Sequence, residues 1–247
     1  MASKTGIQAS LYVTCIIDQL YPEVGVSVVR VLRKLGVTVD FPMKQTCCGQ
    51  PLYNSGHSRE AKELAKRVIE EFSDSQYVVV PSGSCAAMFR VFYADLFEDD
   101  PDLHKSAIDL SNRVYEFSEF LVKILGVTGI GATSSGSHTF HTSCHLLREL
   151  GVKTAPNELL ENVNGIEVKD LPQSEVCCGF GGTFSVKYPH ISEEMLADKV
   201  RNIISTEADI LVSCDMSCLM NIGGALSRNG SSIKTRHLAE VLDGDGS

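Results

Sequence analysis

The 247-residue sequence lacks an excess of positive charge and lacks any long hydrophobic run. It has 22 Lys and Arg against 31 Asp and Glu, a formal net charge of −9. Such a surface repels phosphate backbones and anionic headgroups, which argues against a general nucleic-acid or anionic-membrane binder. The short apolar stretch at residues 12–17 matches neither a signal peptide nor a membrane span. We therefore expect a cytoplasmic protein without a membrane span.

The fingerprints of common cofactor-binding and hydrolytic enzymes are also missing. The sequence contains no Rossmann-type dinucleotide fingerprint, no Walker loop and no convincing Ser-His-Asp set. Gly129 and Gly131 lie in a glycine- and serine-rich stretch without a strand-turn-helix context, so we interpret them as linker. A flavin or nicotinamide, if the function needs one, is expected on a partner.

Cysteine, by contrast, is frequent, with nine residues in the chain. A reducing cytosol keeps thiols reduced, which argues against a disulfide framework, and an odd number would leave one cysteine unpaired. Metal binding or redox chemistry is the better explanation.

The cysteines repeat as a set. Cys47-Cys48-Gly49 recurs as Cys177-Cys178-Gly179, and each copy has one cysteine upstream, at 32 and 33 positions, and one downstream, at 37 and 40 positions. Two matched copies almost exclude coincidence. Eight of the nine cysteines pair off in this way: Cys15, Cys47, Cys48 and Cys85 in the first half, and Cys144, Cys177, Cys178 and Cys218 in the second.

Each half is predicted to be an alternation of strands and helices. Short apolar runs, typical of strands, alternate with runs whose apolar residues have helical spacing. The expected strands are residues 10–15, 37–41 and 77–80, and residues 137–144, 166–171 and 209–212. The βαβαβ order predicts two Rossmann-like α/β halves, each with a short parallel sheet flanked by helices. The cysteines then lie beyond the carboxyl ends of strands, where open α/β sheets bind ligands.

The repeat also predicts the domain organisation. We expect a first repeat with a connecting helix at residues 1–125, a Gly/Ser linker at 126–137 and a second repeat at 138–247. The connecting helix is inferred from the helical spacing of the apolar residues in 114–125.

Four thiolates per half are suited to zinc or to an iron–sulfur cluster. Zinc sites normally use cysteines two to four residues apart, whereas here the close pair is adjacent. Adjacent side chains on extended backbone point apart, so reaching one small ion together is awkward. A multi-iron cluster offers separate iron atoms and suits thiolate-only ligation. We favour an iron–sulfur cluster of the 4Fe–4S type in each half.

The doubled cysteine pattern resembles that of a known family. It is similar to the cysteine-rich (CCG) domain family, which includes heterodisulfide reductase B-type subunits and the iron–sulfur subunits of glycolate oxidase. Four segments resemble its lactate-utilization members in particular: residues 81–85, 141–148, 177–185 and 217–220. The resemblance spans nearly the whole chain.

The resemblance implies an iron–sulfur oxidoreductase subunit, active within a multi-protein complex that oxidises L-lactate to pyruvate. The implied partners are B- and C-type lactate utilization subunits, together with a flavin- or quinone-linked carrier. The implied ligands are Cys15, Cys47, Cys48 and Cys85 for one cluster, and Cys144, Cys177, Cys178 and Cys218 for the other.

The chain departs from the fullest family pattern, which ends in Cys-x-x-Cys. Ser82 and Asp215 stand at the positions of the extra cysteines, with Cys214 one position early as either a fifth ligand or a bystander. This departure argues against five-thiolate noncubane clusters. Two alternatives stay open: a cluster-based thiol–disulfide reductase of the heterodisulfide type, and a non-catalytic protein with structural zinc.

Charged residues close to the second cysteine set are further candidates. His141, His145 and Arg148 flank Cys144, and Arg148 or Lys187 could bind a carboxylate substrate or place positive charge near an anionic cluster. The alternative interpretation is ordinary polarity around a buried site.

Overall fold

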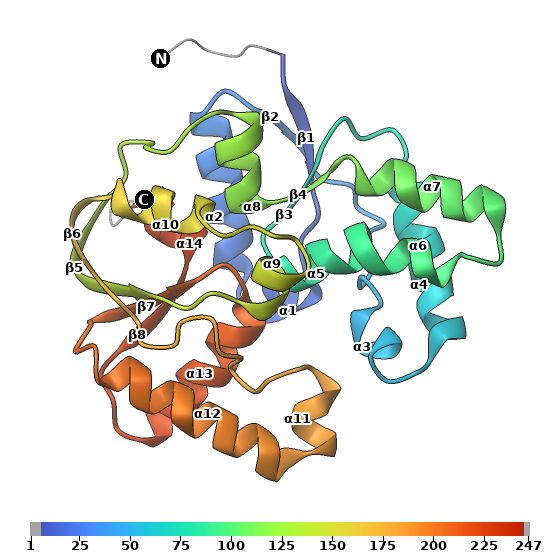
Figure 1. Ribbon diagram of the computed structural model, residues 1–247. Coiled ribbons are helices and arrows are strands. Elements are labelled where there is room, and N and C mark those ends of the chain that lie inside the picture. Colours follow the sequence, from blue (N-terminus) through green and yellow to red (C-terminus); the bar gives the residue numbers. More distant parts are fainter. Residues whose placement is uncertain (1–5, 245–247) are drawn as a thin grey trace.

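Two four-stranded parallel sheets with helices packed against them make up the computed structural model, which describes residues 6–244 (Figure 1). The strand orders are β2-β1-β3-β4 and β6-β5-β7-β8, and every pairing is parallel. The two sheets therefore have the same topology. The predicted α/β fold with two similar Rossmann-like halves is confirmed.

The first half alternates short strands with amphipathic helices. On its longest helix, α4, Ala61, Ala65 and Val68 form one buried stripe, while the charged residues face water. The elements in chain order are β1 (Gln8–Leu11), α1 (Cys15–Leu20), α2 (Pro22–Lys34), β2 (Thr38–Asp40), α3 (Gln50–Tyr53), α4 (Ser58–Glu71), β3 (Val78–Val80), α5 (Gly83–Ala87), the π-helical turn η1 (Met88–Phe92), α6 (Tyr93–Leu96), α7 (Pro101–Ser111), β4 (Val114–Glu116), α8 (Phe117–Glu119) and the π-helical turn η2 (Phe120–Ile124).

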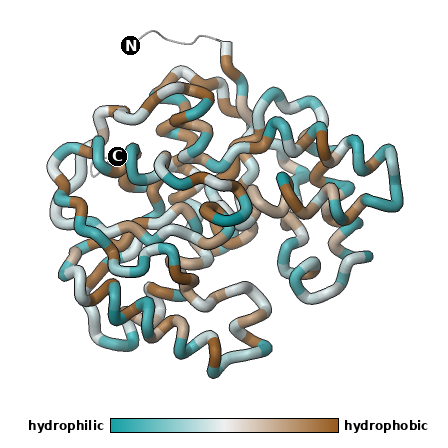
Figure 2. Tube along the Cα trace, in the orientation of Figure 1, coloured by the Kyte–Doolittle hydropathy of each residue, from teal (hydrophilic) through white to brown (hydrophobic). Residues whose placement is uncertain are grey.

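The second half repeats the plan with a longer first strand. In Figure 2 its outer helices alternate between hydrophilic and hydrophobic residues along their length, as amphipathic helices do. Its elements are β5 (Thr133–Phe140), α9 (Cys144–Arg148), α10 (Ala155–Glu161), β6 (Asn164–Lys169), α11 (Thr183–Lys187), α12 (Pro189–Ile204), β7 (Ile210–Ser213), α13 (Met216–Arg228), β8 (Lys234–His237) and α14 (Leu238–Asp243).

Each sheet has a fourth strand that the sequence pattern did not predict. Residues 114–116 form β4, whereas a connecting helix was expected over 114–125, and only 117–124 are helical. The apolar pattern of this segment fits a continuous helix as well as a short strand followed by a helix. In the structure, strand β4 pairs with β3 for three residues and a helical turn follows at once. Strand β8 pairs with β7 in the same way.

The start of the second half differs from the expected linker at 126–137. Strand β5 begins at Thr133 and pairs with β6 from that residue onward, so residues 133–137 are part of the sheet. Small serine and threonine side chains there suited a linker and a strand equally. The limits 1–125 and 138–247 for two domains stay a prediction.

The two halves pack against each other reciprocally. Helix α14 of the second half packs on α2 of the first, and α8 of the first packs on α10 of the second. Helix α5 meets α9 in the same way as α13 meets α1. Each hydrophobic core accordingly includes side chains from both halves. This arrangement has the pattern of an approximate twofold axis, in which equivalent elements exchange partners.

Within residues 6–244, none of the helices combines the length and the apolar character that crossing a membrane requires.

Candidate metal centre

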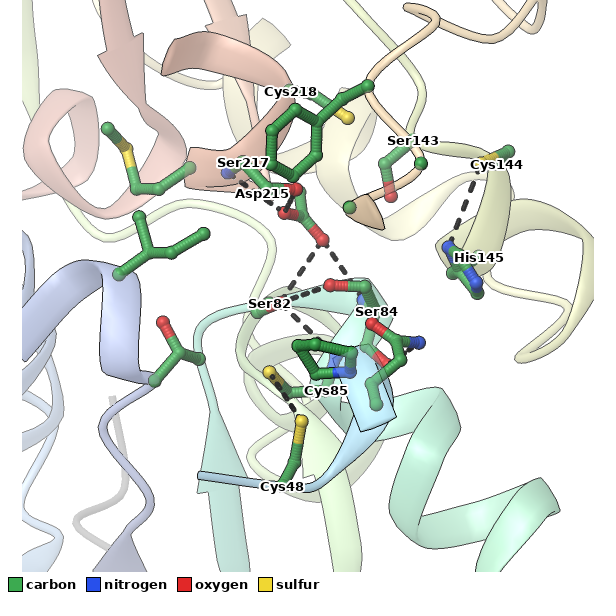
Figure 3. A pocket seen from close by; sticks show the side chains of 18 of the residues that line it. Cys48, Ser82, Ser84, Cys85, Ser143, Cys144, His145, Asp215, Ser217 and Cys218 are labelled. Atoms are coloured by element: carbon green, nitrogen blue, oxygen red, sulfur yellow. Dashed lines mark hydrogen bonds between the residues drawn. The ribbon is translucent and has the colours of Figure 1, made fainter. Parts of the chain in front are cut away.

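The eight paired cysteines line one cavity between the two halves. Figure 3 shows this cavity with Cys48 and Cys85 on one side and Cys144 and Cys218 on another. Cys214 is not among the lining residues. The structure therefore brings together the two sets that the sequence pairs off, and it does so on a shared cavity.

In the first set the four sulfur atoms form a chain of neighbours. The Sγ atoms of Cys15 and Cys47 are 4.0 Å apart, and those of Cys48 and Cys85 are 3.4 Å apart. The thiols of Cys47 and Cys48 also interact with each other. The expectation that adjacent cysteine side chains point apart is therefore wrong at this site, because the backbone at Cys47 and Cys48 is not in a strand.

The second set repeats this arrangement. The Cys144 thiol interacts with Cys177, Cys177 with Cys178, and Cys178 with Cys218. In both sets the second cysteine of the adjacent pair and the last cysteine are buried, whereas the other two reach the surface. Four sulfurs thus converge from three separate segments in each half.

Helix starts position two cysteines of each set. Cys15 and Cys144 are the first residues of α1 and α9, whose N-caps Thr14 and Ser143 accept backbone hydrogen bonds. The last cysteines of the sets lie in the first turns of α5 and α13. The amino end of a helix carries partial positive charge, which suits the negative charge of a metal–thiolate centre. The sequence analysis expected strands to run up to the first cysteines, but β1 and β5 end four residues earlier.

The glycine of each Cys-Cys-Gly motif is required by its backbone and by its surroundings. Gly49 and Gly179 have φ of 85° and 80°, in the left-handed region that favours glycine. A Cβ on Gly179 would lie 2.6 Å from the Ser192 carbonyl oxygen, and the Gly179 N–H points at the Cys177 Sγ, 3.4 Å away. The turn therefore requires glycine, and at Gly179 it supplies a hydrogen bond to a sulfur.

In each set, the first cysteine of the adjacent pair has a lowered pKa. The Cys15 thiol, then that of Cys48 and the Gly49 N–H, lower the pKa of Cys47 well below its usual range. The Cys144 thiol does the same to Cys177. The thiol with the lowered pKa is the one that loses its proton most readily in each set, which favours capture of a thiophilic cation.

Asp215 connects the two halves inside the cavity. Its Oδ1 accepts hydrogen bonds from the Ser217 N–H at 3.1 Å and the Ser217 hydroxyl at 2.6 Å. Its Oδ2 accepts from the Ser82 hydroxyl at 3.1 Å and the Ser84 N–H at 3.0 Å (Figure 3). Ser82 in turn caps α5 by accepting from the Cys85 N–H at 3.3 Å. The residues at the two extra-cysteine positions therefore bond to each other and join helices α5 and α13.

Cys214 has surroundings unlike those of the other cysteines. Its side chain is fully buried, and its thiol lies beside Ser118 and Glu116 of the first half. Burial raises the pKa of Cys214 well above its usual value, with the nearby Glu116 carboxyl adding to the effect. A thiol that stays protonated away from the cavity fits the bystander role.

Of the flanking residues, His145 lies in the cavity and His141 lies behind it. His145 Nδ1 is 3.7 Å from the Cys144 Sγ. His141 is fully buried. Arg148 contacts the Glu175 carbonyl at 3.4 Å, and neither Arg148 nor Lys187 lines the cavity.

The sequence analysis missed Lys199, a fully buried lysine on α12. Its Nζ donates to the carbonyl oxygens of Gln173 at 2.7 Å and Ser174 at 3.3 Å. A signal was available, because Lys199 interrupts the apolar stripe formed by Leu196, Val200 and Ile203.

The donor chemistry fits a thiolate-bound metal centre. Each set offers four sulfurs from a preformed loop and two helix starts, and thiolates are the ligands of iron–sulfur clusters and of structural zinc. A repeated four-cysteine centre on an α/β scaffold defines a class of metal-binding protein. The profile of the cysteine-rich (CCG) domain matches residues 9–90 and 138–223, one match for each half, and the chain belongs to this family.

Within the family, the chain is similar over its full length to lactate utilization proteins. It is 51% identical over 239 residues to lactate utilization protein A 1 of Bacillus mycoides, which covers 97% of this chain and 98% of that protein. It is 50% identical over 237 residues to lactate utilization protein A of Oceanobacillus iheyensis, covering 96% and 97%. The resemblance inferred from the motifs is confirmed.

Among solved structures, similarity is weak. A glutamate racemase from Francisella tularensis aligns with a TM-score of 0.36 and 9% identity, over 96% of this chain and 78% of the racemase. A putative Asp/Glu racemase from Yersinia pestis gives 0.38 and 10%, over 96% of both chains. Similarity of this degree carries no information about function.

Proposed function

We propose that the chain is a cytoplasmic iron–sulfur oxidoreductase subunit of a lactate utilization system, with one 4Fe–4S cluster per half. The proposed ligands are Cys15, Cys47, Cys48 and Cys85 for one cluster, and Cys144, Cys177, Cys178 and Cys218 for the other. The observation that carries the proposal is the pair of equivalent four-thiol sets on one cavity. Sequence identities of 51% and 50% to lactate utilization proteins A, over 97% and 96% of this chain, support a role in lactate utilization.

In this function the clusters would accept and release single electrons, at potentials set by nearby charge and hydrogen bonds. The residues of the chain hold and tune the clusters. Each adjacent cysteine pair is held by its glycine turn, and the cavity keeps the two sites close together. Cys15 is exposed, so the first site has an edge from which electrons can pass to another protein.

Oxidation of L-lactate to pyruvate removes two electrons and two protons from the substrate, so a complete system needs an acceptor chain. We propose that this subunit works with B- and C-type lactate utilization subunits and with a flavin- or quinone-linked carrier. The absence of a nucleotide-binding fingerprint from the sequence supports placing any flavin on such a partner.

The first test is anaerobic reconstitution of the purified chain with iron and sulfide, followed by metal and sulfide analysis and low-temperature EPR. We expect about eight irons and eight sulfides per chain, four of each per cluster. With the partner subunits added, L-lactate should reduce the clusters, whereas glycolate serves as the control substrate. A colourless protein without sulfide would overturn the proposal of iron–sulfur clusters. Clusters that L-lactate does not reduce would overturn the proposal that lactate is the substrate.

Structural zinc is the second candidate, and two distances favour it. Two thiolates on one tetrahedral zinc lie about 3.8 Å apart, given Zn–S bonds of about 2.3 Å. The Sγ separations of 4.0 Å and 3.4 Å in the first set are close to this value. About two zinc ions per chain, one per four-cysteine set, and no acid-labile sulfide would establish this alternative.

A heterodisulfide-type thiol–disulfide reductase is the remaining alternative. The positions of the extra family cysteines are occupied by Ser82 and Asp215, which hydrogen-bond to each other. We therefore expect reconstituted, reduced protein to stay reduced when small disulfides are added, as followed by visible absorption.

A further inference from the structure

The two cysteine sites differ at one equivalent position. Three residues before the first cysteine of each set, the first half has Tyr12 and the second has His141. Both side chains are fully buried. Tyr12 is satisfied, because its hydroxyl donates to the Thr46 carbonyl oxygen at 2.8 Å. Within residues 6–244, neither ring nitrogen of His141 makes a well-formed hydrogen bond, although the backbone of Ser174 interacts with the ring.

The His141 imidazole faces the second cysteine set. A ring nitrogen of His141 and the Sγ atoms of Cys178 and Cys218 all lie within 4.8 Å of one another, and all three residues are buried. No hydrogen bond joins the ring to either sulfur. The three atoms are thus separated by a gap, yet they are close enough to bind one metal ion.

Leaving His141 without a well-formed hydrogen bond is energetically unfavourable. A buried polar atom without a hydrogen bond loses the bonds that water would give it, and almost all buried polar atoms in folded proteins have partners. A metal ion would satisfy the ring, since a neutral imidazole offers one lone pair and histidine is the commonest metal ligand. Thiolate and imidazole together are an established ligand combination for zinc and for iron.

We propose that the second site is a mixed thiolate–imidazole centre, in which His141 binds metal together with Cys178 and Cys218, whereas the first site has thiolate ligands only. The identity of the metal as iron rests on the proposed function. The ligand set does not, because it follows from the positions of the three side chains.

A second observation points to the same asymmetry between the sites. Ala61 lies over Gly49 and Ser192 lies over Gly179, which aligns helix α4 with helix α12. Seven residues further along, the first half has Val68 and the second has the buried Lys199.

The ammonium group of Lys199 interacts electrostatically with the second set, through the thiols of Cys178, Cys177 and Cys218. A neutral nitrogen ligand and a nearby cation both make a centre less negative, and this raises its reduction potential. An electron shared between the two sites would therefore reside on the second site.

Cadmium-113 NMR tests the ligand set directly. Cadmium binds thiolate and imidazole sites, and its chemical shift separates all-sulfur from mixed coordination. The anaerobic apoprotein, labelled with nitrogen-15 at its seven histidines, is loaded with cadmium. We expect two resonances, one in the all-thiolate range and one shifted toward mixed coordination and split by nitrogen-15.

Variants assign the split resonance. Cys15→Ser with Cys47→Ser should remove the all-thiolate resonance and leave the split one. His141→Gln should abolish the splitting and weaken cadmium binding at the second site by at least about tenfold, because losing even an outer-shell partner costs 10–100-fold. His145→Ala, which alters the other histidine beside Cys144, should leave the splitting intact. Circular dichroism checks that each variant is folded.

Two spectroscopic outcomes would overturn the inference. Two unsplit resonances in the all-thiolate range, or a splitting that survives in folded His141→Gln, would show that His141 is not a ligand. This outcome is independent of the proposed function. If the protein incorporates iron and sulfide but shows no nitrogen splitting, the cluster proposal stands and the His141 ligand is excluded. If it shows nitrogen splitting but takes up no sulfide, the His141 ligand stands and the cluster proposal is excluded.

Discussion

Glu116 and His237 occupy equivalent positions in the two halves and are both fully buried at their junction. Each ends the fourth strand of its sheet and caps the helix that follows. Glu116 Oε2 accepts from the Ser118 N–H at 2.9 Å, and His237 Nδ1 accepts from the Ala239 N–H at 3.1 Å. Each also keeps one buried polar atom, Glu116 Oε1 and His237 Nε2, without a hydrogen-bond partner within residues 6–244. Equivalent places thus hold one acid and one base.

The first prediction concerns Glu116, whose pKa is raised by burial from its ordinary 4.5 to about 7. Because the folded state retains the proton that the unfolded state has released, the free energy of unfolding falls as pH rises from about 4.5 through 7. The loss amounts to about 3 kcal/mol by pH 8. Glu116→Gln should abolish this fall, measured by urea unfolding at several pH values. Glu63→Gln, on an exposed helix face, is the control that should change nothing.

The second prediction concerns His237 and has the opposite sign. Burial lowers its pKa from 6.5 to about 4, so its contribution to stability is present above 6.5 and is lost as pH falls toward 4. In the wild type this trend offsets that of Glu116 between about pH 4.5 and 6.5. His237→Asn retains a capping side chain and should remove this offset, so that rising pH lowers stability more across that range than it does in the wild type. An unchanged pH profile in His237→Asn would contradict the assignment.

The third prediction concerns the bond between Asp215 and Ser82. Asp215→Ala removes a helix cap and leaves the Ser82 hydroxyl and Ser84 N–H without their acceptor. We expect the free energy of unfolding to fall by about 2–4 kcal/mol, a cap of about 1 plus the cost of the buried orphans. Asp100→Ala removes only the cap of α7 and should cost about 1 kcal/mol. A double-mutant cycle with Ser82→Ala measures the coupling, and additive effects would exclude a bond between the halves.

The fourth prediction separates the ligands from the bystander cysteine. Cys48→Ser and Cys178→Ser should each remove the iron of one half, leaving about four irons per chain. Cys214→Ser should leave the iron content unchanged, because Cys214 does not line the cavity. Iron and sulfide analysis after anaerobic reconstitution gives all three results. Loss of iron in folded Cys214→Ser would make Cys214 a ligand.

The fifth prediction concerns the charge of Lys199. Lys199→Met removes a buried cation near the second set, so reduction there becomes less favourable. We expect a potential lower by at least about 60 mV, equivalent to a tenfold change for one electron. EPR-monitored redox titration resolves the two sites, and the first should not move. Lys66→Met, at an exposed position on α4, is the matched control.

The cysteine pattern was sufficient to predict the two four-cysteine sets, and the alternation of apolar runs predicted the repeated α/β fold. The turn at each Cys-Cys-Gly motif depends on local sequence, because glycine readily adopts the positive φ found at Gly49 and Gly179. Strand β4 was missed because Val114 and Phe117 fit helical spacing, and only its pairing with β3 makes it a strand. The bond between Ser82 and Asp215 joins residues 133 positions apart and depends on how the halves dock, which no local pattern encodes.

The reciprocal packing of α2 with α14 and of α8 with α10 has a consequence for the origin of the chain. Because the helix pairs that pack across the junction have counterparts made by equivalent elements, two copies of one half could associate through the same surfaces as a symmetric dimer. Fusion of two such subunits would then have freed each copy to change separately. A histidine and a lysine in one copy, against a tyrosine and a valine in the other, are the kind of divergence that a symmetric dimer of identical chains could never acquire.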